Sequence, residues 1–362
     1  MSYLQYDLPG LEVQDVVASQ LVHKGAQEKY RLHHQGLNRM GGKEQDLTAV
    51  DVLRAWKALF GSTIRRTPLT QSRSLSEATG AEIHMKWENL QVTGSYKPRG
   101  ALYRMGLLSS DERARGVMTA SAGNWALGVA MAAQIMGIQT TICVPANTPK
   151  VKADRCRAFG AEVVLHGSYF DEASEHCQEL SRAKGATYVS GTDDYDVFAG
   201  HGTVGVEILE DLPEVESILI PVGGGGLASG ISCWAKTINP DIRIIGAQST
   251  AAHTMHECFK ARRLVDVPVP STIAEGLAGG IAQLNLDLAL KLIDDIVLAD
   301  EEDLLKTIRW VLAVERQVIE GSAAVGPAAL LEKKVKVQHG EKMAVVVSGG
   351  NIDLDKIGVP GL

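Results

Sequence analysis

The chain has 362 residues and a net charge of −7, from 36 basic and 43 acidic side chains. Hydrophobic residues make up 45% of the chain and charged residues 22%, which is typical of a soluble globular protein with a sizeable core. The sequence has no basic block and no apolar run near the roughly 18 residues of a membrane span, so we expect neither nucleic acid nor a membrane as a partner.

The first 45 residues differ in character from the rest. The opening MSYLQYDLPGLEVQD has neither a basic nor an apolar segment, which predicts no secretory signal. The following QEKYRLHHQGLNRMGGKEQD is polar and punctuated by glycine, so we expect an N-terminal arm over residues 1–45. The adjacent His33 and His34 have no acidic or thiol partner nearby, which favours a solvated surface pair over a metal site.

Short apolar runs then alternate with segments of helical periodicity. The predicted strands cover 116–121, 140–145, 161–167, 216–222, 242–248 and 342–347. The predicted helices cover 124–137, 150–160, 171–185, 227–238, 302–317 and 322–336. Apolar strands separated by amphipathic helices predict parallel sheets covered on both faces, so we expect an α/β fold.

The cysteines are scattered and odd in number. None forms a CxxC pair, and several lie in apolar runs: Cys143, Cys156, Cys177, Cys233 and Cys258. This usage predicts reduced packing cysteines in a cytoplasmic protein and gives no support for a zinc site.

The stretch ENLQVTGSYKPRGA, residues 88–101, places Lys97 in what we expect to be a constrained turn. Small and hydroxylated residues precede the lysine, and a proline follows it. Taken alone, such a lysine is more often a surface side chain whose amine reaches water. Its meaning therefore depends on the other motifs of the chain.

The stretch PVGGGGLASG, residues 221–230, connects a predicted strand to a predicted helix through Gly223, Gly224, Gly225 and Gly226. Successive N–H groups without Cβ atoms can curl around an anion, and a helix N-terminus adds positive potential. The alternative is a flexible turn. No GK[ST] follows and the GxGxxG context is missing, so a bound phosphate is not expected to be that of ATP or NAD.

Two further strand ends carry polar groups. SAGNWALG, residues 121–128, presents Ser121, Gly123 and Asn124 at a helix start, although an asparagine there is equally well explained as an N-cap. VVSGGNID, residues 346–353, ends the last strand at Ser348, and by itself such a turn is ordinary.

Together these segments predict one cofactor. An anion nest, a lysine able to form a Schiff base and polar groups around a ring meet the requirements of pyridoxal phosphate. In α/β sheets such groups meet at the carboxyl edge of the strands.

At this point the chain resembles a known family, the serine/threonine dehydratases of the fold type II pyridoxal-phosphate enzymes. The resemblance covers about residues 46–362 and rests on ENLQVTGSYKPRGA, SAGNWALG, AGHGTVGVEI, PVGGGGLASGI, TIAEGLAGG and VVSGGNIDL, in the family's order. It corresponds to the short form, without a regulatory domain.

The resemblance implies two open twisted, mainly parallel sheets flanked by helices, with the cofactor in the cleft between two domains. It implies a large cofactor-binding domain over 46–110 and 195–362 and a small mobile domain over 111–194. It also implies a homodimer or homotetramer.

The resemblance implies a role for each matching residue. Lys97 matches the Schiff-base lysine and α-proton base, Gly223 to Gly226 match the phosphate cradle, and Ser348 matches the serine facing the pyridine nitrogen. Asn124 matches the asparagine that donates to the phenolic oxygen. The substrate carboxylate is expected at Ser121, Ala122, Gly123, Asn124 and Trp125.

The implied reaction is elimination from a β-hydroxy amino acid, most directly L-threonine and also L-serine, to give a 2-oxo acid and ammonia. A serine at the ring nitrogen makes the ring a weaker electron sink than an aspartate would, which favours prompt loss of the β-substituent. No side-chain acid for the leaving hydroxide can be named from the sequence.

The departures from the family pattern limit this reading. Ala122 stands where the racemases of the family have a serine, so racemisation should be slow. Gln248 stands where they have a glutamate for a divalent ion, so we expect no such metal, while a monovalent ion is left open. Trp125 and Leu127 replace a histidine and a glutamine, which leaves the substrate open.

The alternatives differ in substrate or in reaction class. If Trp125 lines an apolar wall, 3-phenylserine becomes a substrate; 3-hydroxyaspartate would need a cationic receiver such as His201. A β-replacement synthase is disfavoured because Pro98 and Arg99, rather than Asp-Arg, follow the lysine. A non-catalytic sensor is disfavoured by the intact set of motifs.

Overall fold

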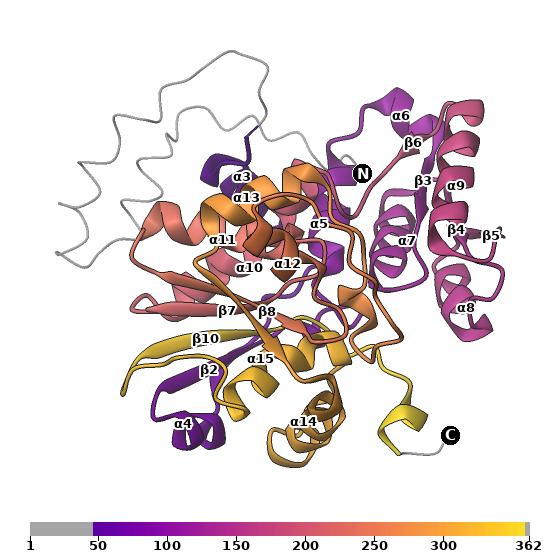
Figure 1. Ribbon diagram of the computed structural model, residues 1–362. Coiled ribbons are helices and arrows are strands. Elements are labelled where there is room, and N and C mark those ends of the chain that lie inside the picture. Colours follow the sequence, from indigo (N-terminus) through magenta and orange to yellow (C-terminus); the bar gives the residue numbers. More distant parts are fainter. Residues whose placement is uncertain (1–45, 359–362) are drawn as a thin grey trace, which may run out of the picture. The chain divides into compact units, whose positions relative to one another are not determined.

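A computed structural model describes residues 46–358 (Figure 1). It confirms the predicted α/β class, with two mainly parallel sheets flanked by helices. The predicted arm over 1–45, including His33 and His34, lies outside the described residues. Within 46–358 no helix is both long enough and apolar enough to cross a membrane.

The larger sheet has six strands in the order β1-β2-β10-β7-β8-β9. All neighbouring strands are parallel except β1, which pairs antiparallel with β2. Its strands are β1 (Leu69–Gln71), β2 (Glu82–Trp87), β7 (Ser217–Pro221), β8 (Arg243–Ser249), β9 (Asp295–Ala299) and β10 (Lys342–Val347).

The smaller sheet has four parallel strands in the order β5-β4-β3-β6. They are β3 (Val117–Ala120), β4 (Thr140–Val144), β5 (Glu162–Leu165) and β6 (Thr187–Tyr188). All four lie within the segment 111–194 that we predict to be the small domain, although the domain boundaries themselves stay a prediction.

The six helices that the sequence predicts are all present, and the structure has seven more within residues 46–358. They are α3 (Ala49–Leu59), α4 (Arg73–Thr79), α5 (Lys97–Gly106), α6 (Ser110–Arg115), α7 (Asn124–Met136), α8 (Lys150–Ala158), α9 (Phe170–Lys184), α10 (Tyr195–Asp211), α11 (Gly226–Ile238), α12 (Thr254–Ala261), α13 (Gln283–Leu292), α14 (Glu301–Val314) and α15 (Gly321–Leu331). Short 3₁₀ turns are η2 (Glu88–Leu90), η3 (Glu275–Leu277) and η4 (Leu354–Ile357).

The larger sheet is buried on both faces, and β10 shows how. Successive side chains of a strand point to opposite faces. Met343, Val345 and Val347 join the core cluster formed with α14 and α15, whereas Ala344 and Val346 join the cluster formed with α10 and α11. Figure 1 shows these helix pairs on opposite sides of the sheet. A strand buried on both faces explains the unbroken apolar run KMAVVV.

Helix α7 is apolar on all sides because it packs in two directions. Trp125 and Val129 join a core cluster with residues of α5 and α10, whereas Ala126 and Leu127 join a cluster with β4. The helix ends at Gly137, whose φ of 66° is a left-handed conformation that glycine adopts without strain. Helix α7 therefore links the smaller sheet to the elements that cover the larger one.

Candidate active site

Three neighbouring strands of the larger sheet bring the predicted site residues to one edge. Strands β2, β10 and β7 are adjacent and parallel, so their carboxyl ends meet at the same edge. Lys97 follows β2, Ser348 directly follows β10, and Gly223 to Gly226 follow β7. Residues far apart in the chain thus share one edge, as the sequence predicts.

The segment before Lys97 is tied to the loop after β10. The backbone N–H of Tyr96 donates to the carbonyl of Ser348 over 3.1 Å, and the N–H of Gly350 donates to the carbonyl of Gly94 over 2.8 Å. These two bonds hold the segment of Lys97 against Ser348 without any contribution from their side chains.

We expected Lys97 to lie in a turn, but it is the first residue of helix α5. Pro98 is tolerated at this helix start because the first N–H groups have no intrahelical partner. The Lys97 amine lies 4.9 Å from the ring centre of Tyr96 and 5.9 Å from that of Trp125. Both aromatic rings lie within cation–π range of the half-buried amine and limit the positions that it can take.

Helix α7 approaches the start of α5 closely enough to need a glycine. A Cβ atom on Gly128 would lie 3.1 Å from the nitrogen of Pro98 and 3.2 Å from the carbonyl carbon of Lys97. This close packing brings the loop that precedes α7, residues 121–123, to the side of Lys97.

The loop 121–123 is open on one side. Ser121 and Ala122 are half-buried, Gly123 is exposed, and a Cβ atom on Gly123 would meet no atom within 4 Å. The Ser121 hydroxyl accepts the N–H of Gly123 over 3.2 Å. The loop can therefore offer backbone N–H groups to an anionic group, which is what we predict for the substrate carboxylate.

Asn124 begins α7, but its side chain does not cap the helix. Its amide nitrogen donates to both carboxyl oxygens of Glu320, over 2.8 and 3.1 Å. Its carbonyl oxygen accepts the side-chain N–H of Asn351 over 2.7 Å. The N-cap explanation of Asn124 is therefore wrong, because its carboxamide faces the loop after β10 rather than its own helix.

Glu320 is a buried carboxyl group beside this asparagine. Burial raises the pKa of Glu320 to about 7, opposed by the hydrogen bonds from Asn124 and the Asn351 backbone and by Lys97. In the unfolded chain the same carboxyl ionises near its ordinary pKa of 4.5. The folded protein therefore keeps a proton that the unfolded chain releases between these two pH values.

We expect Glu320 to make the free energy of unfolding fall with rising pH. Its contribution is fully present below about pH 4.5 and is lost as the pH rises through about 7, with a total of roughly 3 kcal/mol. Urea unfolding at a series of pH values should show this decline in the parent and a smaller one in Glu320→Gln. Equal pH dependence in the two proteins would contradict the assignment.

The glycine loop has the geometry of an anion cradle. Gly225 immediately precedes α11 and has a φ of 94°, in the left-handed region. A Cβ atom on Gly223 would lie 2.9 Å from the carbonyl oxygen of Gly276. The first N–H groups of α11 have no intrahelical acceptor and lie at the positive end of the helix dipole, so they suit a phosphate.

Gly225→Ala should weaken cofactor binding by about tenfold, because the cradle loses N–H alignment worth about one hydrogen bond. The matched control is Gly340→Ala, since Gly340 also has a positive φ (76°) and a Cβ atom there would meet nothing within 4 Å. Both variants should lose about 1 kcal/mol of stability from backbone strain, and Gly225→Ala also brings its Cβ atom to 3.0 Å from the end of the Met255 side chain. Titration of apoprotein with cofactor checks this; equal affinities in the two variants would argue against a cradle.

Trp125 and Leu127 are core residues. Trp125 is 6% exposed, and its indole N–H donates to the hydroxyl of Thr119 over 2.9 Å. A Cβ atom on Gly191 would lie 2.7 Å from the indole, and Leu127 is 5% exposed. Both side chains point back into the protein, which gives no support to the apolar wall that 3-phenylserine would need.

His201 cannot serve as the receiver of a substrate carboxylate. It lies in α10, is fully buried, and stacks edge-on against Tyr96 with ring centres 4.7 Å apart. Burial lowers the pKa of His201 well below its ordinary value, and Lys97 and Arg99 lower it further. The imidazole is therefore neutral and closed off from ligands.

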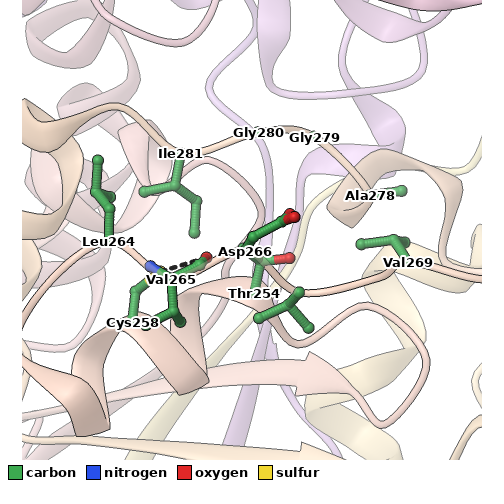
Figure 2. Close-up of a pocket in the computed structure, with 11 residues that line it drawn as sticks. Thr254, Cys258, Leu264, Val265, Asp266, Val269, Ala278, Gly279, Gly280 and Ile281 are labelled. Atoms are coloured by element: carbon green, nitrogen blue, oxygen red, sulfur yellow. Dashed lines mark hydrogen bonds between the residues drawn. The ribbon is translucent and has the colours of Figure 1, made fainter.

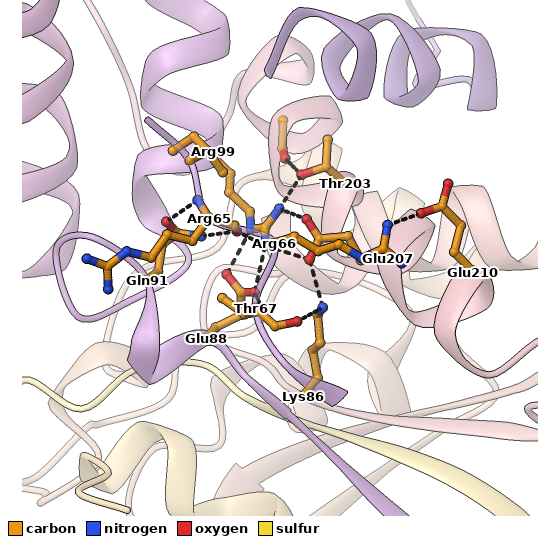
Figure 3. A network of polar contacts seen from close by, with 12 residues as sticks. Arg65, Arg66, Thr67, Lys86, Glu88, Gln91, Arg99, Thr203, Glu207 and Glu210 are labelled. Atoms are coloured by element: carbon orange, nitrogen blue, oxygen red, sulfur yellow. Dashed lines mark hydrogen bonds and ion pairs between the residues drawn. The ribbon is translucent and has the colours of Figure 1, made fainter. Parts of the chain in front are cut away.

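A buried ion-pair network surrounds Arg99, which lies two residues after Lys97 in α5 (Figure 3). Arg99 donates to both carboxyl oxygens of Glu88, each over 2.8 Å, and to those of Glu207, over 2.7 and 2.9 Å. Lys86 donates to Glu207 over 2.7 Å. Burial lowers the pKa of Arg99, but the effect of the two carboxylates is larger and raises this pKa above its ordinary value. Two cations balance two anions, so the network can remain fully ionised.

The predicted site residues do not line the cavity shown in Figure 2. This cavity of about 260 Å³ is formed by α12 and the segments 264–269 and 278–281. Most of its lining side chains are apolar, but polar and apolar atoms contribute equally to its walls, and Asp266 is the only carboxylate among the described lining residues. No residue of the glycine loop lines this cavity. The loop lies next to Gly280, which does line it, since a Cβ atom on Gly224 would lie 3.4 Å from the carbonyl oxygen of Gly280. We assign it no part in the chemistry.

Sequence reasoning missed Glu320 and Asn351. Asn351 lies inside the VVSGGNID motif but was given no role there. The available signal for Glu320 was a single acidic residue between Ile319 and the apolar run of α15. A carboxylate in such a place is seldom buried unless it has partners, and here Asn124 and Asn351 are those partners.

The sequence pattern of the family described as "Pyridoxal-phosphate dependent enzyme" matches residues 61–349. The chain belongs to this family. It is 44% identical over 313 residues to an L-threonine ammonia-lyase of Thermotoga maritima, covering 86% of this chain and 77% of the relative. Among solved structures, maize serine racemase has a TM-score of 0.83 at 29% identity, covering 87% of this chain and 96% of that one. Threonine deaminase isoform 2 of Solanum lycopersicum has a TM-score of 0.79 at 35% identity, with coverages of 86% and 85%.

The chain therefore uses pyridoxal phosphate, and the observed edge fits this cofactor. The hydroxyls of Thr93 and Ser95 are buried close to Lys97 in the chain and have no hydrogen-bond partner within residues 46–358, which is costly unless a ligand engages them. A lysine amine, a glycine cradle at a helix start and these hydroxyls together provide an amine, an anion site and polar contacts.

Proposed function

We propose that this chain is an L-threonine ammonia-lyase that also accepts L-serine and releases a 2-oxo acid and ammonia. The observation that carries the proposal is the convergence of Lys97, the glycine cradle and Ser348 on one sheet edge in a chain 44% identical to an L-threonine ammonia-lyase. The predicted cofactor and reaction class agree with this similarity.

Pyridoxal phosphate, when bound, supplies the electron withdrawal that lets an amino acid lose its α-proton and its β-hydroxyl. Lys97 holds the cofactor and accepts the α-proton at its amine. Gly223 to Gly226 would bind the phosphate through backbone N–H groups, and Ser348 would face the pyridine nitrogen. The resemblance to the family suggests these roles, and the positions of the residues at the sheet edge support them.

The substrate is held by the loop that precedes α7. We propose that Ser121 and the N–H groups of Ala122, Gly123, Asn124 and Trp125 receive its carboxylate. The open space beside Gly123 leaves room for it. The buried indole of Trp125 would then contribute its backbone rather than a specificity wall, which favours threonine over 3-phenylserine. No cationic receiver for 3-hydroxyaspartate remains at His201.

A 2-oxo acid release assay across threonine, serine, 3-phenylserine and 3-hydroxyaspartate tests the proposal. We expect the highest kcat/KM for threonine, with serine lower by a few-fold because one methyl group supplies only about 1 kcal/mol of discrimination. Trp125→His should reduce activity on all four without changing their order. A preference for 3-phenylserine that Trp125→His reverses would overturn the choice of substrate.

Ala122→Ser should raise racemisation relative to elimination. Ala122 is half-buried on the open loop, and a hydroxyl there would give the far face of the cofactor a proton donor that the present side chain lacks. Chiral analysis of recovered L-serine, run beside 2-oxo acid formation, measures the ratio. If no enantiomer accumulates in the variant, the position or the role of residue 122 is wrong.

We propose further that residues 46–110 and 195–362 form the cofactor-binding domain and that 111–194 form a smaller, mobile one. We also propose a cytoplasmic homodimer or homotetramer without a divalent metal. Gln248 supports the last point, because its amide donates to the carbonyl of Val222 and accepts the N–H of His256, which occupies both of its ends. Light scattering would test the oligomeric state, and metal analysis would test the absence of a divalent metal.

A further inference from the structure

Glu320 lies where the start of α15 meets the loop after β10, and the proposed function gives this residue no role. It immediately precedes α15, and its backbone N–H donates to the carbonyl of Gly349 over 3.1 Å. A Cβ atom on Gly349 would lie 2.8 Å from one Glu320 carboxyl oxygen. The carboxyl group therefore packs against the residue that follows Ser348, which is proposed to face the pyridine nitrogen.

The hydrogen bonds around Glu320 fix the orientation of two carboxamides. The Asn351 amide nitrogen donates to the backbone carbonyl of Thr93 over 2.8 Å, and its oxygen accepts from the Arg155 guanidinium over 2.7 Å. A carbonyl only accepts and a guanidinium only donates, so neither end of Asn351 can be exchanged. Its nitrogen must then meet the oxygen of Asn124, which turns the nitrogen of Asn124 toward Glu320.

This arrangement leaves Asn124 with one N–H to spare. A carboxamide nitrogen carries two hydrogens, and the carboxyl group of Glu320 receives one of them over 2.8 and 3.1 Å from its two oxygens. The second is free for another acceptor. An asparagine without such partners could turn by 180° and present its oxygen instead, which would repel an anionic phenolic oxygen.

We propose that Glu320 is a positioning residue that acts through Asn124, and that Glu320 and Asn351 together hold its carboxamide so that an N–H faces the phenolic oxygen of the cofactor. This inference rests on the proposed function, because it takes Asn124 as the partner of that oxygen. Glu320 itself need not touch the cofactor, and the residue sets the direction of a hydrogen bond rather than moving a proton.

The test uses holoprotein and reads the visible absorbance of the bound cofactor across a pH series. Glu320→Gln should raise the pH of its half-change by about one unit. A glutamine has one acceptor oxygen for the two N–H donors of Asn124 and the Asn351 backbone, so Asn124 is released, and loss of its N–H makes the phenolic oxygen about tenfold more basic. Asn124→Ala should give a shift of the same size. The double variant should shift no further than either single one, since both changes remove the same interaction.

Glu341→Gln is the matched control. Glu341 is buried to a similar extent, at 8% exposed against 9% for Glu320, and accepts from Ser217, Arg243 and the backbone of Gln338. It lies at the opposite end of β10 from Ser348, so its loss should reduce stability without moving the absorbance midpoint.

An unchanged midpoint in Glu320→Gln, or shifts that add in the double variant, would overturn the proposal. Should Glu320→Gln fail to fold, Asn351→Ala takes its place, because it removes the bond that fixes the other end of Asn124. The same upward shift is then expected, and no shift overturns the proposal. A holoprotein that shows this coupling but does not deaminate threonine would refute the proposed function alone.

Discussion

Lys97→Ala should abolish 2-oxo acid release, with a loss of at least about a thousandfold in kcat, while the protein remains folded. The amine is expected both to hold the cofactor and to accept the α-proton, and alanine supplies neither function. The half-buried side chain opens α5 without an ion pair of its own among the described contacts, so its removal should cost little stability. Ammonia and 2-oxo acid release, with far-UV circular dichroism alongside, measure both expectations.

Lys57→Ala is the control for this substitution, because Lys57 is an exposed lysine in α3. It should retain parental activity. Ammonia release by Lys97→Ala within tenfold of the parental rate would remove Lys97 from its assigned role.

Arg99→Ala should lower the free energy of unfolding by about 3–5 kcal/mol. The guanidinium is 1% exposed and makes four charge-assisted hydrogen bonds to Glu88 and Glu207. Its loss leaves Glu207 paired with Lys86, and Glu88 as a buried carboxylate with the hydroxyl of Thr67 but no cation among the described contacts. Because Arg99 lies two residues after Lys97 in α5, cofactor binding should weaken as well. Arg99→Lys should rescue little, since an ammonium cannot reproduce the planar fork.

Arg66→Ala provides the comparison on the surface. Arg66 is about half exposed and pairs with Glu210 and Asp211, so its loss should cost less than about 1 kcal/mol. Urea unfolding of the three variants at one pH gives the ranking. A cost for Arg99→Ala as small as that for Arg66→Ala would show that the network does not anchor the start of α5.

Much of the fold is legible from the sequence because apolar strands and amphipathic helices leave strong periodic signals. Strand β10 and helix α7 begin at the predicted residues. The patterns missed β9, and also β1 and β6, which have only three and two residues. They missed β2 as well, whose sequence EIHMKW mixes charged and apolar side chains. Lys86 in β2 is fully buried only because Glu207, distant in the chain, pairs with it. A local sequence pattern cannot identify such a distant partner.

The site was predictable in part for a related reason. Motifs at strand ends locate Lys97, Ser348 and the glycine loop, because the edge of a parallel sheet gathers them. The side-chain directions were not predictable. Asn124 faces Glu320 instead of its own helix, and Trp125 points into the core, because both depend on tertiary contacts with residues far along the chain.

The central claim is that Lys97 carries the pyridoxal phosphate. Borohydride reduction of the holoprotein followed by peptide mass mapping tests it most directly. The account predicts the mass of the reduced cofactor on the peptide that contains Lys97, and its loss when L-threonine is present in excess before reduction. Cofactor mass on another lysine, or on none, would contradict it.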